Sequence, residues 1–549
     1  MKGGFTMGYT AHSDRFVREN LPPKEAWPEL IFKLPELQFP DRLNGASELL
    51  DRMALKHPDR PCLVSPGLHL SYGALLEQAN RIAHVLVEDM GLEPGNRVLL
   101  RAPNHPLLVA AWYAVLKAGG IVVTTMPLLR AKELSEIILK AQISHALCDI
   151  RLKDELEQAR AGCPCLKQAL YWGEGGQLEA LMRGKPSTFA NLDTASDDAA
   201  LIAFTSGTTG KPKGCVHFHR DLLAICDTFG KYILRASPED VFIGSPPLAF
   251  TYGLGGLVLF PMRIGARSVL LERASPELLL AAIPEFKASV VFTSPTAYRA
   301  MAPLAQQHDL SSLKKCVSAG EPLPASTRRL WKEVTGIELI DGIGATEMLH
   351  IFISHTEEEA KPGATGKPVP GYEACVLDKE GNPLPPGQIG RLAVKGPTGC
   401  RYLADERQYN YVQNGWNITG DAYLVDEQGY FIYQARTDDM IVSAGYNIAG
   451  PEVEDALLLH PAVAECAVVG APDPERGQVV KAYVVLRPGL SPSAELVKEL
   501  QDFVKQQIAP YKYPRLIEFR ESLPHTQTGK LQRFVLRQEA ASEAANRLS

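Results

Sequence analysis

Residues 205–214 read Thr-Ser-Gly-Thr-Thr-Gly-Lys-Pro-Lys-Gly, directly after an apolar run at 199–204 that is short enough to be a buried strand. Glycines let backbone N–H groups approach a bulky anion, hydroxyl side chains add donors, and lysine adds a mobile positive charge. The stretch therefore predicts a loop that wraps a polyphosphate. The plainer alternative is a flexible surface loop, which clusters of Gly, Ser and Thr usually form.

This loop differs from the Walker motif of many nucleotide-binding proteins. Only two residues separate Gly207 from Gly210, and Pro212 follows Lys211 where that motif needs serine or threonine. The prediction of phosphate binding therefore depends on the glycines, hydroxyls and lysines of the loop itself.

Length and composition limit the class of protein. A chain of 549 residues is too long for one hydrophobic core and predicts at least two domains. Its 45% hydrophobic and 22% charged residues are typical of a folded globular protein. The net charge of −6 gives no electrostatic reason to expect nucleic acid or an anionic membrane as a partner.

The cysteines and the apolar stretches indicate the cellular compartment of the protein. The ten cysteines are scattered, without zinc-type spacing or a disulfide framework, which favours a reducing cytoplasm. Residues 1–6 lack the apolar core of a signal peptide. The most apolar stretch, 107–129, is interrupted by Lys117 and two glycines, so it predicts a buried helix and strand. We expect a cytoplasmic protein without integral membrane association.

Strand and helix signals alternate along the chain. Apolar runs at 98–100 and 121–123 flank a helix near 107–118, and Ser71 is expected to cap another helix. Further strands are predicted at 240–244, 267–271, 288–293, 313–318 and 337–341, and further helices at 276–286, 295–305 and 324–335. This alternation predicts an α/β fold of parallel sheets covered by helices, with ligands beyond the carboxyl ends of the strands.

The pattern changes in the last third of the chain. Turn signals are dense between 363 and 396, and the strands there look short. A smaller α+β unit is expected to begin near Arg436, with strands at 463–469 and 479–486, a helix at 493–507 and a charged tail.

Residues 205–214 resemble the signature loop of the adenylate-forming superfamily, which contains acyl- and aryl-CoA ligases, amino-acid adenylation domains and luciferases. The resemblance covers essentially the whole chain. It implies a large N-terminal ATP- and acyl-binding domain at 1–436, including a β subdomain at 363–436. A hinge at 437–440 and a mobile C-terminal domain at 441–549 would follow.

Three further motifs resemble the family's nucleotide site. Glu347 closes Asp-Gly-Ile-Gly-Ala-Thr-Glu at 341–347, where the family glutamate holds ATP-bound Mg²⁺, a metal that suits a hard carboxylate. Residues 318–322 resemble the adenine-binding turn, and Asp421 with Arg436 resembles the pair that holds the ribose. Ordinary turns with solvated acidic side chains are the alternative for each motif.

The resemblance implies one list of ATP and AMP contacts: Thr205, Ser206, Gly207, Thr208, Thr209, Gly210, Lys213, Gly320, Glu321, Pro322, Asp341, Gly342, Thr346, Asp421 and Arg436. Lys530, in Leu-Pro-His-Thr-Gln-Thr-Gly-Lys at 523–530, resembles the lysine that enters the site from the small domain. It would neutralise charge on the α-phosphate. The implied catalytic residues are Lys530, Glu347 and Thr205; a solvated tail lysine is the alternative for Lys530.

The acyl site is predicted around two stretches, 250–255 and 344–352. Aromatic side chains of Phe250 and Tyr252 would pack on a ring, and His350 would orient a polar edge, although a core histidine is an equal alternative. Gly253 and Gly344 complete the implied substrate contacts. Thr251 stands where amino-acid adenylation domains usually carry aspartate, and both stretches are similar to benzoate- and 2-aminobenzoate-CoA ligases.

The resemblance implies that an aromatic carboxylate is converted to its CoA thioester through an acyl-AMP, with ATP, Mg²⁺ and coenzyme A. Rotation about Asp438 would bring Ser443 and Gly445 to coenzyme A. The alternatives are a stand-alone adenylation enzyme that loads a carrier protein, a medium-chain acyl-CoA ligase and a non-catalytic nucleotide-binding protein. The sequence leaves a homodimer open.

Overall fold

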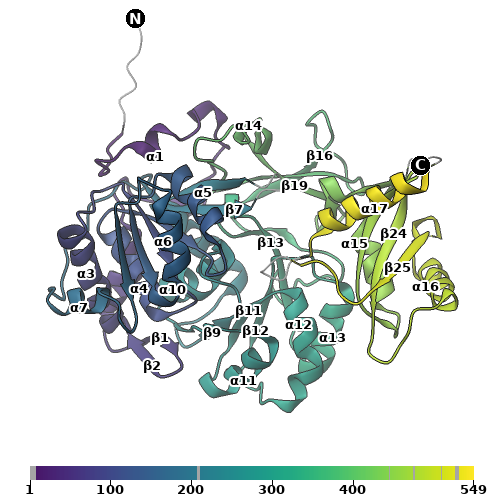
Figure 1. Ribbon diagram of the computed structural model, residues 1–549, viewed down its shortest axis with the longest axis horizontal. Helices are drawn as coiled ribbons and strands as arrows, with labels where there is room; N and C mark the ends of the chain where they lie inside the picture. The colour runs from purple at the N-terminus through teal and green to yellow at the C-terminus, as the bar shows by residue number, and fades with distance from the viewer. Residues whose placement is uncertain are drawn as a thin grey trace, which may run out of the picture.

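A computed structural model describes residues 8–206, 211–443, 446–473, 476–508, 510–525 and 531–548. Figure 1 shows a large body built from the first part of the chain and a smaller one from the last part, drawn in yellow-green. None of the helices in the described ranges combines the length and apolar character that a membrane span requires. The described strands form four sheets.

The first sheet contains the predicted phosphate loop. Its order is β6 (Gln168–Trp172), β5 (His145–Asp149), β3 (Arg97–Arg101), β4 (Ile121–Thr125), β7 (Ala199–Ser206) and β8 (Pro212–Phe218). The strands from β6 to β7 are parallel, as the buried apolar runs predicted. The helix α4 (Pro106–Lys117) joins β3 to β4 and is buried along its whole length.

β8 was not predicted, and it changes the setting of the loop. β7 and β8 form an antiparallel hairpin in which Thr205 pairs with Lys213. The glycine-rich loop therefore joins two strands, rather than a strand and a helix. Side chains of directly paired residues lie on the same face, so Thr205 and Lys213 are presented together.

The second and larger sheet carries the other nucleotide motifs. Its order is β15 (Lys367–Pro368), β14 (Ile351–Ser354), β13 (Leu339–Gly344), β12 (Lys315–Ser318), β11 (Val290–Thr293), β9 (Val241–Gly244), β10 (Arg267–Val269), β1 (Pro61–Ser65) and β2 (Leu68–Ser71). The strands from β13 to β1 are parallel, whereas the edges at β14, β15 and β2 are antiparallel. The predicted parallel sheets are thus mixed at their margins.

Helices pack against both sheets. Those near the second sheet are α11 (Pro276–Phe286), α12 (Pro295–Met301) and α13 (Ala325–Thr335), and a 3-10 turn continues α12 to Gln307. The helix expected after Ser71 is α3 (Tyr72–His84); the Ser71 side chain accepts a bond from the Ala74 N–H. The remaining helices of the large body are α1 (Phe16–Glu19), α2 (Arg52–Lys56), α5 (Ala131–Ala141), α6 (Lys153–Ala161), α7 (Leu178–Arg183), α8 (His219–Ile225), α9 (Thr251–Leu254), α10 (Phe260–Ile264) and α14 (Gln408–Tyr411).

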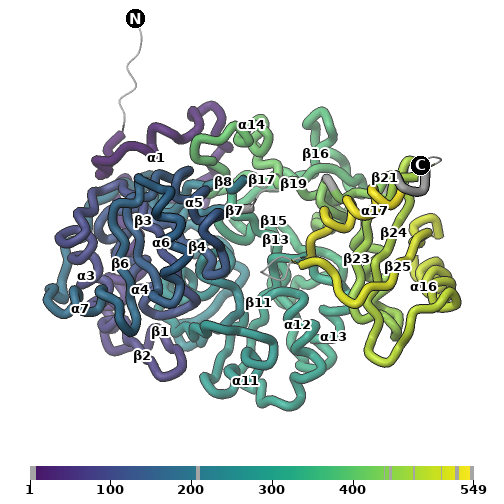
Figure 2. The backbone as a smooth tube through the Cα atoms, viewed as in Figure 1, coloured from purple at the N-terminus to yellow at the C-terminus, as the bar shows by residue number. Residues whose placement is uncertain are grey.

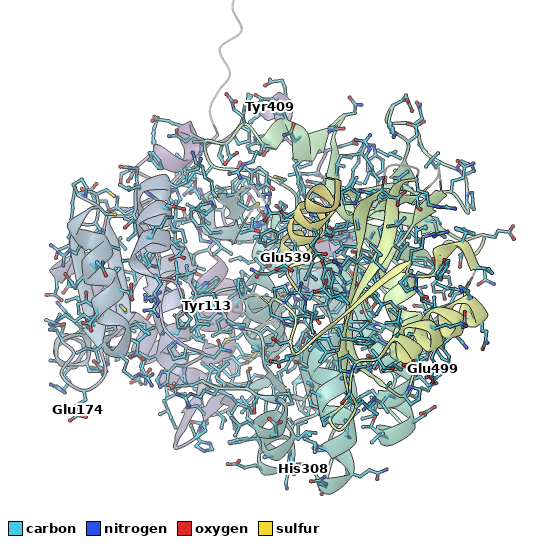
Figure 3. The ribbon with its side chains drawn as sticks, turned by 45° about the vertical axis from the view of Figure 1, so that its right-hand side comes forward. Tyr113, Glu174, His308, Tyr409, Glu499 and Glu539 are labelled. Carbon is cyan, nitrogen blue, oxygen red and sulfur yellow. The ribbon has the colours of Figure 1, made fainter. Side chains whose placement is uncertain are left out.

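One hydrophobic core connects the two large sheets. It includes Leu100 and Val122 from the first sheet, Phe242 and Phe292 from the second, and Tyr113 of α4 between them. Tyr113 is labelled in Figure 3, inside the large body. The backbone trace in Figure 2 shows β7 and β13 near the middle of the molecule. Both strands contribute residues to this core.

The predicted turn-rich region forms the third sheet. It contains β16 (Glu373–Leu377), β17 (Gly390–Lys395), β19 (Trp416–Val425) and β18 (Val412–Gln413), and β20 (Phe431–Arg436) pairs with β19. Every pairing in it is antiparallel. The predicted hinge at 437–440 lies between β20 and the first strand of the fourth sheet.

The fourth sheet consists of β22 (Tyr446–Ile448), β21 (Ile441–Ser443), β24 (Gly477–Leu486), β23 (Val463–Asp473) and, beside β24, β25 (Leu516–Arg520). Successive residues of β23 point to opposite faces. Val468 packs with α15 (Gly450–Leu458) and α16 (Ala494–Gln507), whereas Ala467 and Val469 pack with α17 (Arg533–Leu548). Figure 3 shows α17, with Glu539, and α16, with Glu499, on either side of the strands. The expected charged tail is thus a helix.

Candidate active site

Lys213, Tyr402 and Glu347 form a connected polar group beside the phosphate hairpin. The Lys213 ammonium donates to the Tyr402 hydroxyl at 2.7 Å and lies 3.5 Å from Oε1 of Glu347. The Tyr402 hydroxyl in turn donates to the same Glu347 oxygen. The structure thus brings together the predicted Lys213 and Glu347, and it adds Tyr402, which the motifs did not indicate.

Glu347 lies in a 3-10 turn at Thr346–Met348, just after β13, and is 7% exposed. Within the described chain no group donates to its second oxygen, Oε2. No cluster of three or more metal-binding side chains occurs among the described residues. One carboxylate with a free oxygen fits Mg²⁺, which is commonly held by one or two carboxylates together with substrate phosphates.

Two buried polar atoms lie on adjacent strands near the predicted adenine-binding turn. Ser318 of β12 pairs with Asp341 of β13, and neither Ser318 Oγ nor Asp341 Oδ1 has a hydrogen-bond partner within the described chain. Burial raises the pKa of Asp341 to about 7, although Arg328 lowers it. Ser318 is the last residue of β12, and Asp341 is the last residue of β13 that pairs with β12; ligands of α/β sheets bind near the carboxyl ends of parallel strands.

The turn itself, at 318–322, is open on one side. Gly320 has a φ of 90°, in the left-handed region that favours glycine, and a Cβ there would meet nothing within 4 Å. The Glu321 carboxylate accepts a bond from the Thr296 hydroxyl at 2.7 Å. Pro322 follows in the loop that leads to α13. Glu321 is thus anchored to the neighbouring helix α12.

Asp421 and Arg436 are opposite each other on β19 and β20. Arg436 Nη1 donates to Asp421 Oδ1 at 2.9 Å and to the Thr419 carbonyl at 3.2 Å. Burial raises the pKa of Asp421, while Arg436 lowers it. The negative charge of Glu347 also contributes to the raised pKa of Asp421. The predicted ribose pair and the predicted metal ligand therefore lie in one region.

His350, three residues after Glu347 in the sequence, is surrounded by aromatic rings. Its ring centroid lies 4.6 Å from Phe260, 5.4 Å from Phe229 and 5.7 Å from Tyr252. The side chain is 2% exposed, and neither ring nitrogen has a hydrogen-bond partner within the described chain. Burial lowers the pKa of His350 to about 3, so the imidazole is neutral at pH 7.

Local backbone features make room for this imidazole. Leu349 has a φ of 68°, which is unfavourable for leucine, and turns the chain between Glu347 and His350. Gly255 also faces the ring, because a Cβ there would lie 2.3 Å from His350 Cδ2. Leu349 therefore has a strained backbone and Gly255 cannot carry a side chain without a clash, and both lie beside a histidine that has no hydrogen-bond partner among the described residues.

The other predicted acyl-site residues lie close by. The Tyr252 hydroxyl donates to the Thr293 and Val317 carbonyls at 3.1 Å each, which fixes its ring beside His350. Phe250 is half-buried at the start of α9. Gly253 and Gly344 are required by packing: a Cβ would lie 2.2 Å from the Pro247 carbonyl oxygen and 2.8 Å from that of His350, respectively.

Two more predicted nucleotide contacts have backbone roles. Gly342 of β13 packs against Ile351, since a Cβ there would lie 2.7 Å from Ile351 Cγ2. The Thr346 carbonyl is 2.7 Å from Nε2 of His217, which fixes the turn that carries Glu347. Both residues therefore shape the backbone next to Glu347.

Several predicted residues lie outside the described part of the chain. These are Gly207, Thr208, Thr209, Gly210, Gly445 and Lys530, together with the side chains of Ser206 and Asp438. Ser443 is 2% exposed and its hydroxyl has no partner within the described residues. Arg533, three residues after Lys530, donates a hydrogen bond to Glu454 at 2.6 Å. Its positive charge also acts on Tyr433 of β20, where it opposes the rise in the pKa of that tyrosine.

Comparisons with known proteins identify the family. The family model "AMP-binding enzyme" matches residues 50–402, and "AMP-binding enzyme C-terminal domain" matches residues 452–530. A benzoate–CoA ligase of Thauera aromatica is 33% identical over 512 residues, which cover 92% of this chain and 97% of that protein.

Two solved structures share the fold. The anthranilate CoA ligase AuaEII in complex with anthranoyl-AMP is 34% identical, with a TM-score of 0.89 over 93% of this chain and 100% of that one. A benzoate CoA ligase from Burkholderia xenovorans LB400 is 32% identical, with a TM-score of 0.82 over 90% and 100%. The chain belongs to the AMP-binding enzyme family, within the adenylate-forming superfamily, and is an AMP-forming acid–thiol ligase.

Proposed function

We propose that this protein is an ATP-dependent aryl-CoA ligase whose acid is of the benzoate or 2-aminobenzoate type. The observation that carries the proposal is the neutral His350 imidazole, which is buried among aromatic rings and whose two nitrogens have no hydrogen-bond partner within the described chain. A buried polar group without a partner costs about 1–3 kcal/mol, so a ligand that supplies a hydrogen bond gains affinity and specificity there. The likeness to benzoate and anthranilate CoA ligases supports the same substrate class.

In the first half-reaction a carboxylate oxygen attacks the α-phosphorus of ATP. A new oxygen–phosphorus bond forms, the bond to the β-phosphate breaks, and acyl-AMP and pyrophosphate result. Thr205 and Lys213 on the hairpin would bind the phosphates, and Lys530 would neutralise negative charge at the α-phosphate. Glu347 would hold Mg²⁺, which when bound supplies positive charge to the phosphates.

The nucleoside end of ATP would extend toward the second and third sheets. Asp421, held by Arg436, would accept bonds from the ribose hydroxyls. The unpaired Asp341 and Ser318 oxygens lie beside the turn at 318–322, where polar atoms of adenine would pair with them. The acyl ring would lie on the opposite side of Glu347, beside Tyr252 and His350.

In the second half-reaction the thiol of coenzyme A attacks the acyl carbonyl. A carbon–sulfur bond forms, AMP leaves with the electron pair of its bond to carbon, and the thiol proton is released. Lys530 has to withdraw before this step so that the thiol can reach the carbonyl. We propose that rotation at 437–440, about Asp438, makes this exchange and brings the segment with Ser443 and Gly445 to the site.

Carboxylate-dependent ATP–pyrophosphate exchange tests the substrate class. We expect benzoate and 2-aminobenzoate to support faster exchange than medium-chain fatty acids. Preference for a fatty acid would contradict the aryl pocket and leave the ligase class intact.

AMP release with coenzyme A, compared with AMP release with a phosphopantetheinylated carrier protein, tests which thiol accepts the acyl group. We expect coenzyme A to be preferred.

A further inference from the structure

We propose that Tyr402 is a positioning residue for the metal site: its hydroxyl holds one oxygen of Glu347 so that the other oxygen faces the metal. The inference deepens the proposed function and rests on it. Tyr402 lies between β17 and α14, far in sequence from Glu347 and from the phosphate hairpin. Its connection to both arises only in the folded chain.

The Tyr402 hydroxyl is the central member of a three-residue chain of hydrogen bonds. It accepts from the Lys213 ammonium at 2.7 Å and donates to Oε1 of Glu347. Lys213 Nζ is also 3.5 Å from that oxygen, so the ammonium and the hydroxyl act on the same side of the carboxylate. Oε2 receives no donor from the described chain. The carboxylate is therefore oriented with one oxygen engaged and one left for a cation.

The Tyr402 side chain is itself firmly held. It is 1% exposed, and its backbone N–H donates to the Gln408 side-chain oxygen at 2.9 Å. Its ring meets the Tyr411 ring edge to face at a centroid distance of 5.8 Å. A backbone bridge to Cys215 of β8 ties Tyr402 to the phosphate hairpin. Because these contacts fix the Tyr402 hydroxyl, it can determine which way the Glu347 carboxylate points.

The hydroxyl also holds the Lys213 ammonium, whose bond to Tyr402 is 2.7 Å long and whose direct contact with Glu347 is 3.5 Å long. In a variant without the hydroxyl, the Lys213 ammonium, which lies 4.7 Å from the Tyr402 ring centroid, would pair more closely with Glu347. Lysine would then compete with the divalent cation for the same charge. Loss of an outer-shell partner of a metal ligand typically weakens metal affinity by about 10–100-fold.

The neighbouring ring provides a matched control. The Tyr411 hydroxyl is buried and has no hydrogen-bond partner within the described chain. Tyr411→Phe therefore removes a hydroxyl from the same cluster without removing a bond, whereas Tyr402→Phe removes the bond to Glu347. Both variants keep the ring and its packing, and their melting temperatures show whether each is folded.

The test measures Mn²⁺ affinity by electron paramagnetic resonance in the presence of a non-hydrolysable ATP analogue. We expect Tyr402→Phe to raise the Kd for Mn²⁺ about tenfold, with AMP affinity in EDTA unchanged and Tyr411→Phe equal to wild type. A similar Kd in Tyr402→Phe and wild type would overturn the inference, as would an equal loss in Tyr411→Phe. The proposed function fails separately if wild type lacks carboxylate-dependent pyrophosphate exchange.

Discussion

The polar groups around Glu347 and the imidazole of His350 differ in how they are paired within the described chain. On the nucleotide side, Lys213, Tyr402 and Glu347 form a continuous set of hydrogen bonds. In the predicted acyl site, the His350 imidazole has no hydrogen-bond partner among the described residues although it is almost completely buried. Because buried polar groups are normally paired, the unpaired imidazole indicates a position where a ligand would supply the missing hydrogen bond.

The largest expected effect is on the nucleotide side and concerns Lys530. Lys530→Ala should slow adenylation about 10²–10³-fold, the scale of losing one preorganised charge partner. Thioester formation from supplied acyl-adenylate should be largely spared, because that step needs the lysine to be withdrawn. The two half-reactions are measured separately, as pyrophosphate exchange and as AMP release. Equal damage to both would exclude the proposed role.

A smaller effect is expected on the acyl side. His350→Phe keeps a flat ring among the aromatic residues and removes the unpaired nitrogens. Exchange with 2-aminobenzoate should fall about tenfold, the scale of one hydrogen bond, while exchange with benzoate changes less. The free energy of unfolding should rise by about 1 kcal/mol, because an unsatisfied buried group is removed. Equal loss for both acids would mean that His350 makes no contact with a ring substituent.

A third prediction concerns Asp341, whose Oδ1 has no hydrogen-bond partner within the described chain and which belongs to the predicted nucleotide site. Burial raises its pKa to about 7 from an ordinary value of 3.8. Between these values the folded protein holds a proton that the unfolded chain has released, so its contribution to stability falls as pH rises from about 4 to 7. Relative to wild type, Asp341→Asn should therefore gain stability over this range.

Melting temperatures of wild type and Asp341→Asn at pH 5 and pH 8 measure this difference. A larger advantage of the variant at pH 8 is expected. A difference that does not change with pH would contradict the raised pKa of Asp341.

The smallest expected effect compares two tyrosines of the paired cluster by stability alone. Tyr402→Phe should lower the free energy of unfolding by about 1–2 kcal/mol, because the Glu347 oxygen loses a donor in a buried setting. Tyr411→Phe should change it little, since its hydroxyl has no partner to lose. Chemical denaturation measures the free energy of unfolding of both variants. Equal losses of stability would contradict the claim that only the Tyr402 hydroxyl makes a stabilising hydrogen bond.

Local sequence signals were sufficient for much of the fold. The buried runs at 98–100 and 121–123 and the cap at Ser71 correspond to β3, β4 and the start of α3. Two of the elements that were not predicted show why local signals did not suffice for the rest. β8 contains lysine, proline and glycine, so only its pairing with β7 establishes it as a strand. The charged tail becomes α17 because one face of it covers β23.

The site shows the same division between local and long-range information. Glu347 and Asp421 lie in short motifs that could be recognised in the sequence, and their predicted roles remain to be tested. Tyr402 lies in no such motif, since its partners are 55 and 189 residues away along the chain. The absence of partners at His350 within the described chain likewise depends on four aromatic neighbours from different segments. Such relations are set by tertiary packing.

The most direct test of the account is a crystal structure of the protein with AMP and 2-aminobenzoate. We expect the phosphate against the β7–β8 hairpin, the ribose at Asp421 and the ring beside His350, with a hydrogen bond to one of its nitrogens. A nucleotide bound away from the hairpin, or a ring bound away from His350, would contradict the account.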